Sequence, residues 1–173
     1  MTATTREAVT SAGGPDPVPP EMFREVMTRF ARSVTVVTAY DEEHPVGCTA
    51  TAVLSLTDRP PTLLASLASG GGTLRHIRAA GRFGVSVLPY RLHALAARFA
   101  ELPAARRFDG VDHVCAHGAP LLRGAVAGVV CRVDRYVPLA DHTLVIGRVV
   151  HAETDEAAEP LIHFARRQTR PEV

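Results

Sequence analysis

The sequence predicts a mainly β protein: a closed antiparallel barrel of six or seven strands with a few short flanking helices. Runs rich in Val, Ile and Thr recur at strand length between turn residues. Most connections between these runs are of hairpin length, which suits antiparallel neighbours. Helical periodicity is confined to short segments. Together these observations favour a closed barrel over a doubly wound parallel sheet.

The chain has 173 residues, of which 46% are apolar, enough for one core and too few for two comfortable ones. Residues 1–19 are rich in Thr, Ala, Gly and Pro and contain almost no large apolar side chains. Such a segment buries too little apolar surface to compensate for the conformational entropy lost on ordering, so we expect a disordered tail. Residues 20–170 are expected to form a single domain.

The first ordered element is expected to be an amphipathic helix. Phe23, Val26, Met27 and Phe30 recur at helical spacing, which predicts a helix that packs on the sheet. Residues 33–40 are β-branched almost throughout and end at the turn-like segment 41–45, so they predict the first strand.

The run 46–57 alternates strictly and predicts one further strand. The face expected to be core carries Val46, Cys48, Ala50, Ala52, Leu54 and Leu56. The opposite face carries the hydroxyls of Thr49, Thr51 and Ser55. Pro60 and Pro61 break the pattern because neither can donate to a ladder, and residues 62–67 resume as a short strand.

Residues 69–73, Ser-Gly-Gly-Gly-Thr, then open a helix that ends at Gly81. Backbone N–H groups of such a loop can approach an anion closely, Thr73 is a candidate N-cap, and the helix dipole favours a phosphate there. A merely flexible turn is the alternative. The loop matches neither a Walker A sequence nor a dinucleotide-binding fingerprint.

The rest of the chain alternates strands with connections. A strand is expected at 82–88 and a helix around 92–99. Residues 103–120 are interpreted as a long irregular connection. Two longer strands are expected at about 124–137 and 142–152, followed by an acidic loop at 153–160.

Composition argues against several classes of function. Nineteen basic against eighteen acidic residues leave no basic footprint for nucleic acid. The N-terminus lacks the pattern of a secretory signal, and no apolar run is long enough to span a membrane, so a cytoplasmic protein is expected. Cys48, Cys115 and Cys131 form no CxxC pair and are expected to be buried thiols. The scattered histidines give no ligand spacing, so no metal site is expected.

No nucleophile with an adjacent base is evident, which favours chemistry supplied by a cofactor. His142 opens a late strand, where it could contact a substrate or serve as a half-exposed structural residue. The Arg106-Arg107 and Arg166-Arg167 pairs are expected to be solvated.

The order of segments resembles the flavin reductase family with the FMN-binding split β-barrel fold. The resemblance covers about residues 20 to 168. The motifs that carry it are FREVM (23–27), VTVVT (34–38), PVGCTA (45–50), Ser55 before Pro60-Pro61, GRFGVSVL (81–88), RFDGV (107–111), GAPLL (118–122) and DHTLVIG (141–147).

The resemblance implies a homodimer that reduces FMN or FAD with NADH or NADPH by hydride transfer from nicotinamide C4 to flavin N5. The reduced flavin would diffuse to a partner monooxygenase or halogenase. By the same resemblance His142 would contact the nicotinamide. The residues implied for flavin binding are Thr49, Ala50, Thr51, Ala52, Ser66, Leu67, Ala68, Gly71, Gly72, Thr73, Ser86 and Val87.

Several positions depart from the family pattern. Thr51 and Ser86 stand where Asn is usual, and Cys48 where Met or Phe is usual. The loop 69–72 lacks the Lys or Arg that ordinarily holds the phosphate, and charge-assisted bonds are about twice as strong as neutral ones. These departures motivate an alternative: a protein on the same scaffold that binds flavin or another ligand without reductase activity, or a recruited biosynthetic catalyst.

Overall fold

The computed structural model describes residues 16–42 and 44–171. Most of the expected N-terminal tail, residues 1–15, lies outside this range. The helices are α1 Pro20–Met27, α2 Gly72–Ala80 and α3 Ala94–Glu101, with 3₁₀ helices η1 Tyr90–Leu92 and η2 Ala104–Arg106. The strands are β1 Arg32–Ser33, β2 Thr35–Asp41, β3 His44–Ala50, β4 Val53–Asp58, β5 Pro61–Ala68, β6 Arg82–Val87, β7 His113–Ala116, β8 Ala119–Leu122, β9 Ala127–Leu139, β10 His142–Thr154, β11 Ile162–Phe164 and β12 Arg167–Thr169.

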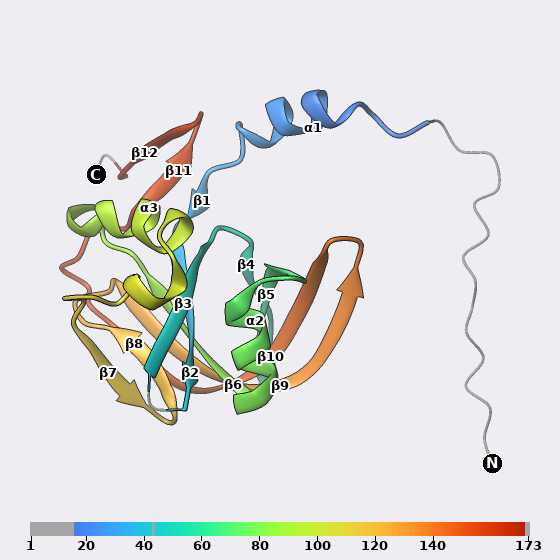
Figure 1. The fold of residues 1–173 in the computed structure, drawn as a ribbon. Helices are drawn as coiled ribbons and strands as arrows, with labels where there is room; N and C mark the ends of the chain where they lie inside the picture. The colour runs from blue at the N-terminus through green and yellow to red at the C-terminus, as the bar shows by residue number, and fades with distance from the viewer. Residues whose placement is uncertain (1–15, 43, 172–173) are drawn as a thin grey trace, which may run out of the picture.

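The main sheet has seven antiparallel strands in the order β3-β2-β6-β9-β10-β5-β4 (Figure 1). Its two edge strands, β3 and β4, are consecutive in the chain and are joined by residues 51–52 alone. The sheet must therefore curl until its edges meet. The amide of Ser66 in β5 donates to the carbonyl of Ala52 at this junction, with an N···O distance of 2.9 Å. The mainly β, barrel-like fold is confirmed.

The prediction of one strand over residues 46–57 was wrong. A barrel corner at Thr51 and Ala52 divides it, because β3 pairs with β2 whereas β4 pairs with β5. The expected core face also ends at Ala50: beyond the corner Ala52, Leu54 and Leu56 are exposed.

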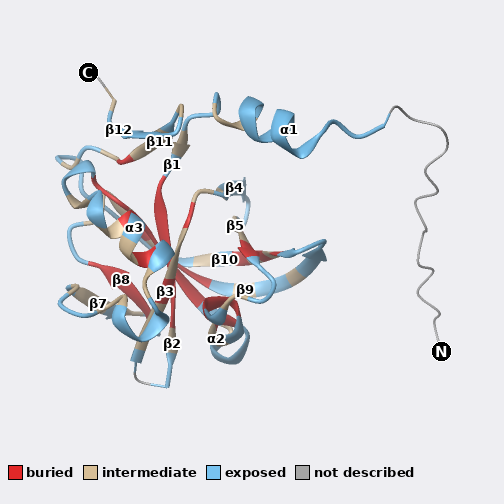
Figure 2. Cartoon of the chain, turned by 45° about the horizontal axis from the view of Figure 1, so that its top comes forward, coloured by how far each residue is buried: buried red, intermediate tan, exposed pale blue. Residues whose placement is uncertain are grey.

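The core lies in two main clusters (Figure 2). One fills the barrel under α2 and includes Phe83, Ile77 and Val145, each fully buried. The other lies under α3 around Phe99, whose ring meets the edge of Phe108 at a centroid distance of 4.9 Å. Helix α2 ends where predicted, since Gly81 caps it in the left-handed conformation (φ 65°).

Helix α1 is placed differently from expectation. We predicted that it packs on the sheet, yet none of its residues is buried, and it stands away from the barrel (Figures 1 and 2). Its position is defined by the hairpin β11–β12: the amide of Ala165 donates to the carbonyl of Thr28 at 2.9 Å, and Arg166 pairs with Glu25.

The interval 103–120, predicted to be irregular, contains η2 and the hairpin β7–β8. The second strand of this hairpin lies against the sheet, where the hydroxyl of Thr38 donates to the carbonyl of Pro120. The hairpin β11–β12 was also missed. Among the described residues no helix is both long and apolar enough to cross a membrane.

Candidate functional site

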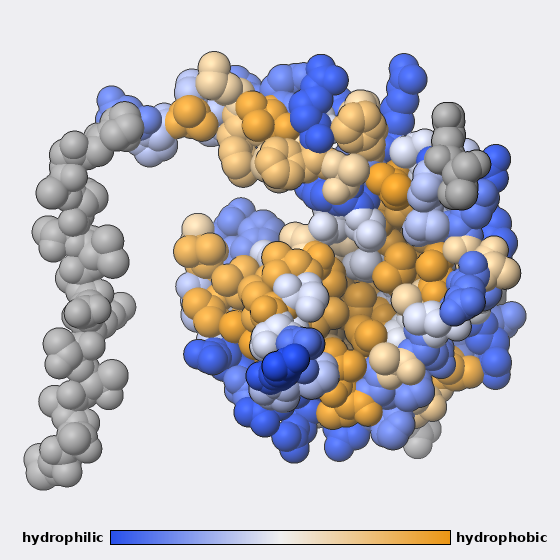
Figure 3. Space-filling view, turned by 180° about the vertical axis from the view of Figure 1, so that it is seen from behind, coloured by the Kyte–Doolittle hydropathy of each residue, from blue (hydrophilic) through white to orange (hydrophobic). Residues whose placement is uncertain are grey.

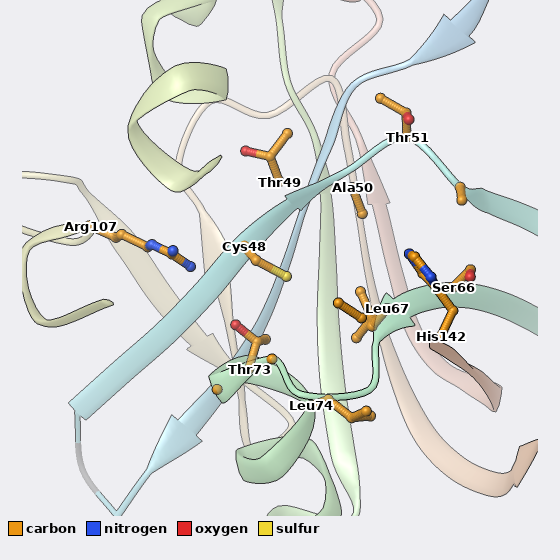
Figure 4. Close-up of a pocket in the computed structure, with 14 residues that line it drawn as sticks. Cys48, Thr49, Ala50, Thr51, Ser66, Leu67, Thr73, Leu74, Arg107 and His142 are labelled. Atoms are coloured by element: carbon orange, nitrogen blue, oxygen red, sulfur yellow. The ribbon is translucent and has the colours of Figure 1, made fainter. Parts of the chain in front are cut away.

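A cavity of about 400 Å³ opens between β3, the end of β5 and the start of α2 (Figure 4). This volume falls within the usual range for small-molecule sites. Its lining residues are Cys48, Thr49, Ala50, Thr51, Ala52, Ser66, Leu67, Ala68, Gly71, Gly72, Thr73, Leu74, Arg107 and His142. The cavity thus has apolar walls, several hydroxyls and two side chains able to carry positive charge.

Residues from both alternating faces of β3 line the cavity: Cys48 and Ala50 come from the face expected to be core, and Thr49 comes from the hydroxyl face. The hydroxyl of Thr49 donates to the carbonyl of Ala96 in α3 at 2.7 Å, which ties the strand to that helix. Ala50 is buried, and its methyl group projects from β3 into the cavity (Figure 4). Its small size leaves room that a larger side chain would fill.

The glycine loop is fixed at its base rather than merely flexible. The Ser69 amide donates to the carbonyl of Asp141, and the Ser69 hydroxyl lies 2.9 Å from that of Thr143. The Gly71 amide donates to the carbonyl of Ala68, and a Cβ at Gly71 would lie 3.0 Å from that same oxygen. Glycine therefore permits this tight turn at position 71.

The first turn of α2 faces the cavity. Its N-cap is Gly71, not Thr73 as we predicted, and Thr73 is a buried residue of the helix itself. Glycine has no side chain with which to cap the helix. The first-turn N–H groups, which have no partners within the helix, thus remain available to an anionic ligand at the positive end of the helix dipole.

Cys48 lies at the centre of the cavity beside Thr73 (Figure 4). Burial raises the pKa of its thiol, while the hydrogen bond with Thr73 and the positive charge of Arg107 act in the opposite direction. Because burial dominates, the side chain remains a neutral thiol near neutral pH.

His142 lies at the opposite end of the cavity from Arg107 (Figure 4). Its Nδ1 is 2.9 Å from a carboxylate oxygen of Asp141. The hydrogen bond and the charge of His142 lower the pKa of Asp141. The ring is therefore oriented by a carboxylate while remaining open to solvent and to a ligand.

The structure brings His142 and ten of the twelve residues predicted for flavin binding to this cavity. Ser86 and Val87 lie elsewhere. The buried Ser86 hydroxyl accepts a hydrogen bond from the amide of Leu122, and Val87 lines an apolar hollow on another face. The Ser86 side chain is engaged within the barrel and the Val87 side chain faces a different hollow, so we leave both out of the proposed site.

Three lining residues were not predicted: Cys48, Leu74 and Arg107. Arg107 was expected to be solvated, yet it is partly buried and donates to the carbonyls of Gly47 and Leu102. The position of Arg107 in the RFDGV motif was the sequence signal that could have placed it at the site. The interpretation of all three cysteines as buried thiols is confirmed for Cys131 and is wrong for Cys115, which is exposed, whereas Cys48 is half-buried.

The cavity suits a ligand that has both apolar and polar surface and an anionic end. No group of three or more His, Cys, Asp or Glu side chains that could hold a metal ion occurs within the described ranges. The chemistry of the donors present is that of binding and orientation: hydroxyls, backbone amides, one guanidinium and one imidazole.

Comparison with known proteins gives consistent matches. The family model "Flavin reductase like domain" matches residues 27–171. The NADH-dependent FMN reductase RutF of Ancylobacter novellus is 36% identical over 149 residues, 85% of this chain and 82% of its own length. The actinorhodin polyketide dimerase of Streptomyces coelicolor is also 36% identical, over 84% of this chain and 83% of its own. The NADH:FAD oxidoreductase SgcE6 of Streptomyces globisporus superposes with a TM-score of 0.84 at 33% identity, covering 95% of this chain and all of its own.

Proposed function

The chain belongs to the flavin reductase-like family, and from this premise we propose that it uses NADH to reduce FMN or FAD and supplies the reduced flavin to a partner monooxygenase or halogenase. The observation that carries this proposal is the cavity between β3, β5 and α2, which gathers ten of the predicted flavin-binding residues and His142.

The residues of the cavity fit a flavin. Leu67, Ala50 and Leu74 offer apolar contact for a ring system, and Thr49, Thr51 and Ser66 offer hydroxyls for its polar edge. The start of α2 and Arg107 offer donors for a phosphate. When bound, flavin supplies the chemistry: its N5 accepts a hydride from nicotinamide C4. The protein's task is to hold two rings in contact, which needs no acid or base.

A steady-state assay tests this function. NADH consumption by the purified protein should depend on added FMN or FAD and should far exceed the spontaneous rate. Parallel assays with NADPH, and with each flavin in turn, decide the reductant and the preferred flavin. Absence of flavin-dependent consumption with either nicotinamide would contradict the proposal. A cytoplasmic location stays a prediction, which cell fractionation tests.

A second candidate function is a recruited biosynthetic catalyst on the same scaffold. It is favoured by the similarity to a protein named polyketide dimerase and by the absence of a cation from the loop 69–73. A tightly bound non-flavin aromatic compound that co-purifies with the protein, together with no NADH consumption in the presence of flavin, would support this alternative over the first.

His142 is proposed to contact the nicotinamide at the open end of the cavity. Replacing His142 with Ala should raise the KM for NADH about two- to tenfold, the loss expected for one hydrogen bond. Initial rates at varied NADH measure the effect. His93→Ala is the control, because His93 is exposed and lies outside the cavity. An unchanged KM for NADH in His142→Ala would contradict the proposed contact between His142 and the nicotinamide.

We also propose that the protein is a homodimer. Met22, Phe23 and Val26 of α1 and the following Phe30 are each more than half exposed. Leu54 and Leu56 of β4 are about half exposed as well. Figure 3 shows that α1 overhangs an apolar surface of the barrel. An apolar helix face and an apolar sheet face left open in one subunit are explained by a second copy that covers both.

The double variant Phe23→Asp/Val26→Asp should convert the dimer into a monomer, because two charges would be buried unpaired in the interface. Light scattering after size-exclusion chromatography measures the mass. Arg24→Asp is the matched control, since Arg24 is an exposed polar residue of the same helix. A monomeric wild type, or a double variant that stays dimeric, would contradict this assignment of the interface.

A further inference from the structure

The glycine loop after β5 provides no cation for a bound phosphate. The loop 69–73 has no charged side chain, and the whole sequence contains no lysine. A cationic partner for a phosphate near the start of α2 would therefore be an arginine or a protonated histidine from elsewhere in the chain. Among the described residues that line the cavity, Arg107 is the arginine present.

The guanidinium of Arg107 is held in place by neutral groups. Its Nη1 donates to the carbonyl of Gly47 at 2.7 Å, and its Nε donates to the carbonyl of Leu102 at 2.8 Å. Within residues 16–42 and 44–171, no carboxylate forms an ion pair with Arg107 and no protein acceptor takes up its Nη2. A partly buried charge without a counter-charge is a favourable partner for an anion.

This charge lies at the end of the cavity where α2 begins. Figure 4 shows Arg107 pointing from the 103–111 segment toward Cys48 and Thr73, at the end opposite His142. Its field reaches this corner, since it opposes the burial that raises the pKa of the Cys48 thiol. The first turn of α2 begins at the same corner. One arginine and a set of backbone N–H groups thus converge there.

A second arginine holds the segment that carries the first. Arg98 in α3 donates from Nε to the carbonyl of Arg107 and from Nη2 to the carbonyls of Arg106 and Asp109, at N···O distances of 2.8, 3.1 and 2.5 Å. The planar fork of a guanidinium can bind several carbonyls at once, which lysine cannot reproduce. Arg98 thereby fixes the backbone from which the Arg107 side chain extends.

We propose that Arg107 is the cationic anchor for the 5′-phosphate of the flavin and that Arg98 is a positioning residue for it. The inference rests on the proposed function and deepens it. The cation then comes from the segment between α3 and β7 and not from the loop after β5, so phosphate recognition depends on the packing of α3 against β3.

FMN and riboflavin differ only in the phosphate, so their comparison isolates this contact. The ratio of kcat/KM for FMN to that for riboflavin should fall about 10- to 100-fold in Arg107→Gln, the loss expected for a charge-assisted hydrogen bond. The ratio for Arg107→Lys should lie between those of the wild type and Arg107→Gln, because lysine retains the charge but lacks the planar guanidinium group. Arg98→Gln should lower the same ratio, and added salt should reduce FMN affinity less in both Gln variants than in the wild type.

Arg75→Gln is the matched control. Arg75 and Arg78 line a second hollow beside the glycine loop. The guanidinium of Arg78 lies over the Tyr136 ring, so Arg75 is the competing arginine. Its replacement should leave the FMN to riboflavin ratio unchanged. An unchanged ratio in Arg107→Gln, or a loss carried by Arg75→Gln instead, would overturn the inference while reductase activity remained. A wild type that reduces neither flavin would overturn the proposed function and this inference with it.

Discussion

Ala50→Phe is expected to lower kcat/KM for FMN reduction at least 100-fold while the protein stays folded. The methyl group of Ala50 projects into the cavity from β3 (Figure 4), so a benzyl ring there occupies the space that a flavin ring needs. A 100-fold loss corresponds to about 2.8 kcal/mol of transition-state binding. Initial rates at varied FMN measure the activity, and circular dichroism with a thermal melt shows that the fold persists.

Ala79→Phe is the matched control for this prediction. This substitution introduces the same side chain on the exposed face of α2, and Ala79 does not line the cavity. Its activity should equal that of the wild type. A folded Ala50→Phe protein that reduces FMN at the wild-type rate would show that the reaction takes place somewhere else on the molecule.

Gly84→Ala is expected to destabilise the fold by about 3 kcal/mol, the upper end of the range for overpacking a core. A Cβ at Gly84 in β6 would collide with the carbonyl oxygen of Pro120 and with the hydroxyl of Thr38, which are hydrogen-bonded to each other. Both groups are buried, so neither moves without loss of that bond. Urea unfolding at equilibrium measures the change in the free energy of unfolding.

Gly70→Ala is the control, because a Cβ at Gly70 would meet no described atom within 4 Å. Its free energy of unfolding should stay within about 0.5 kcal/mol of the wild-type value. A Gly84→Ala protein as stable as Gly70→Ala would show that β8 does not lie on β6 as closely as described.

The main sheet was predictable because its strands carry local signals, whereas the two short hairpins were not equally visible. The turn of β7–β8 has positive φ at His117 (46°) and Gly118 (82°), the conformation that glycine favours in a two-residue hairpin, so Gly118 was a signal that could have been used. The turn of β11–β12 has positive φ at Ala165 (49°) and Arg166 (61°), residues that rarely adopt it. That hairpin carries no local signal.

Two wrong predictions have a common cause: the single strand over residues 46–57 and the solvated Arg107. The alternation over residues 46–57 continues through the corner at Thr51, and the corner arises because β3 and β4 pair with different strands. Arg107 gains its position from an acceptor 60 residues away, the carbonyl of Gly47. Both depend on tertiary contacts, which no local pattern encodes. By contrast, the hydroxyls of β3 and the loop after β5 were found because their spacing is local.

This chain is expected to catalyse hydride transfer from NADH to flavin. The most direct test is anaerobic rapid mixing of the protein and FMN with NADH, followed by the absorbance of both. We expect flavin bleaching and NADH oxidation to proceed together in equal amounts, far faster than without protein, and we expect Ala50→Phe to abolish this acceleration. Bleaching at the spontaneous rate with wild-type protein, for FMN and FAD alike, would contradict it.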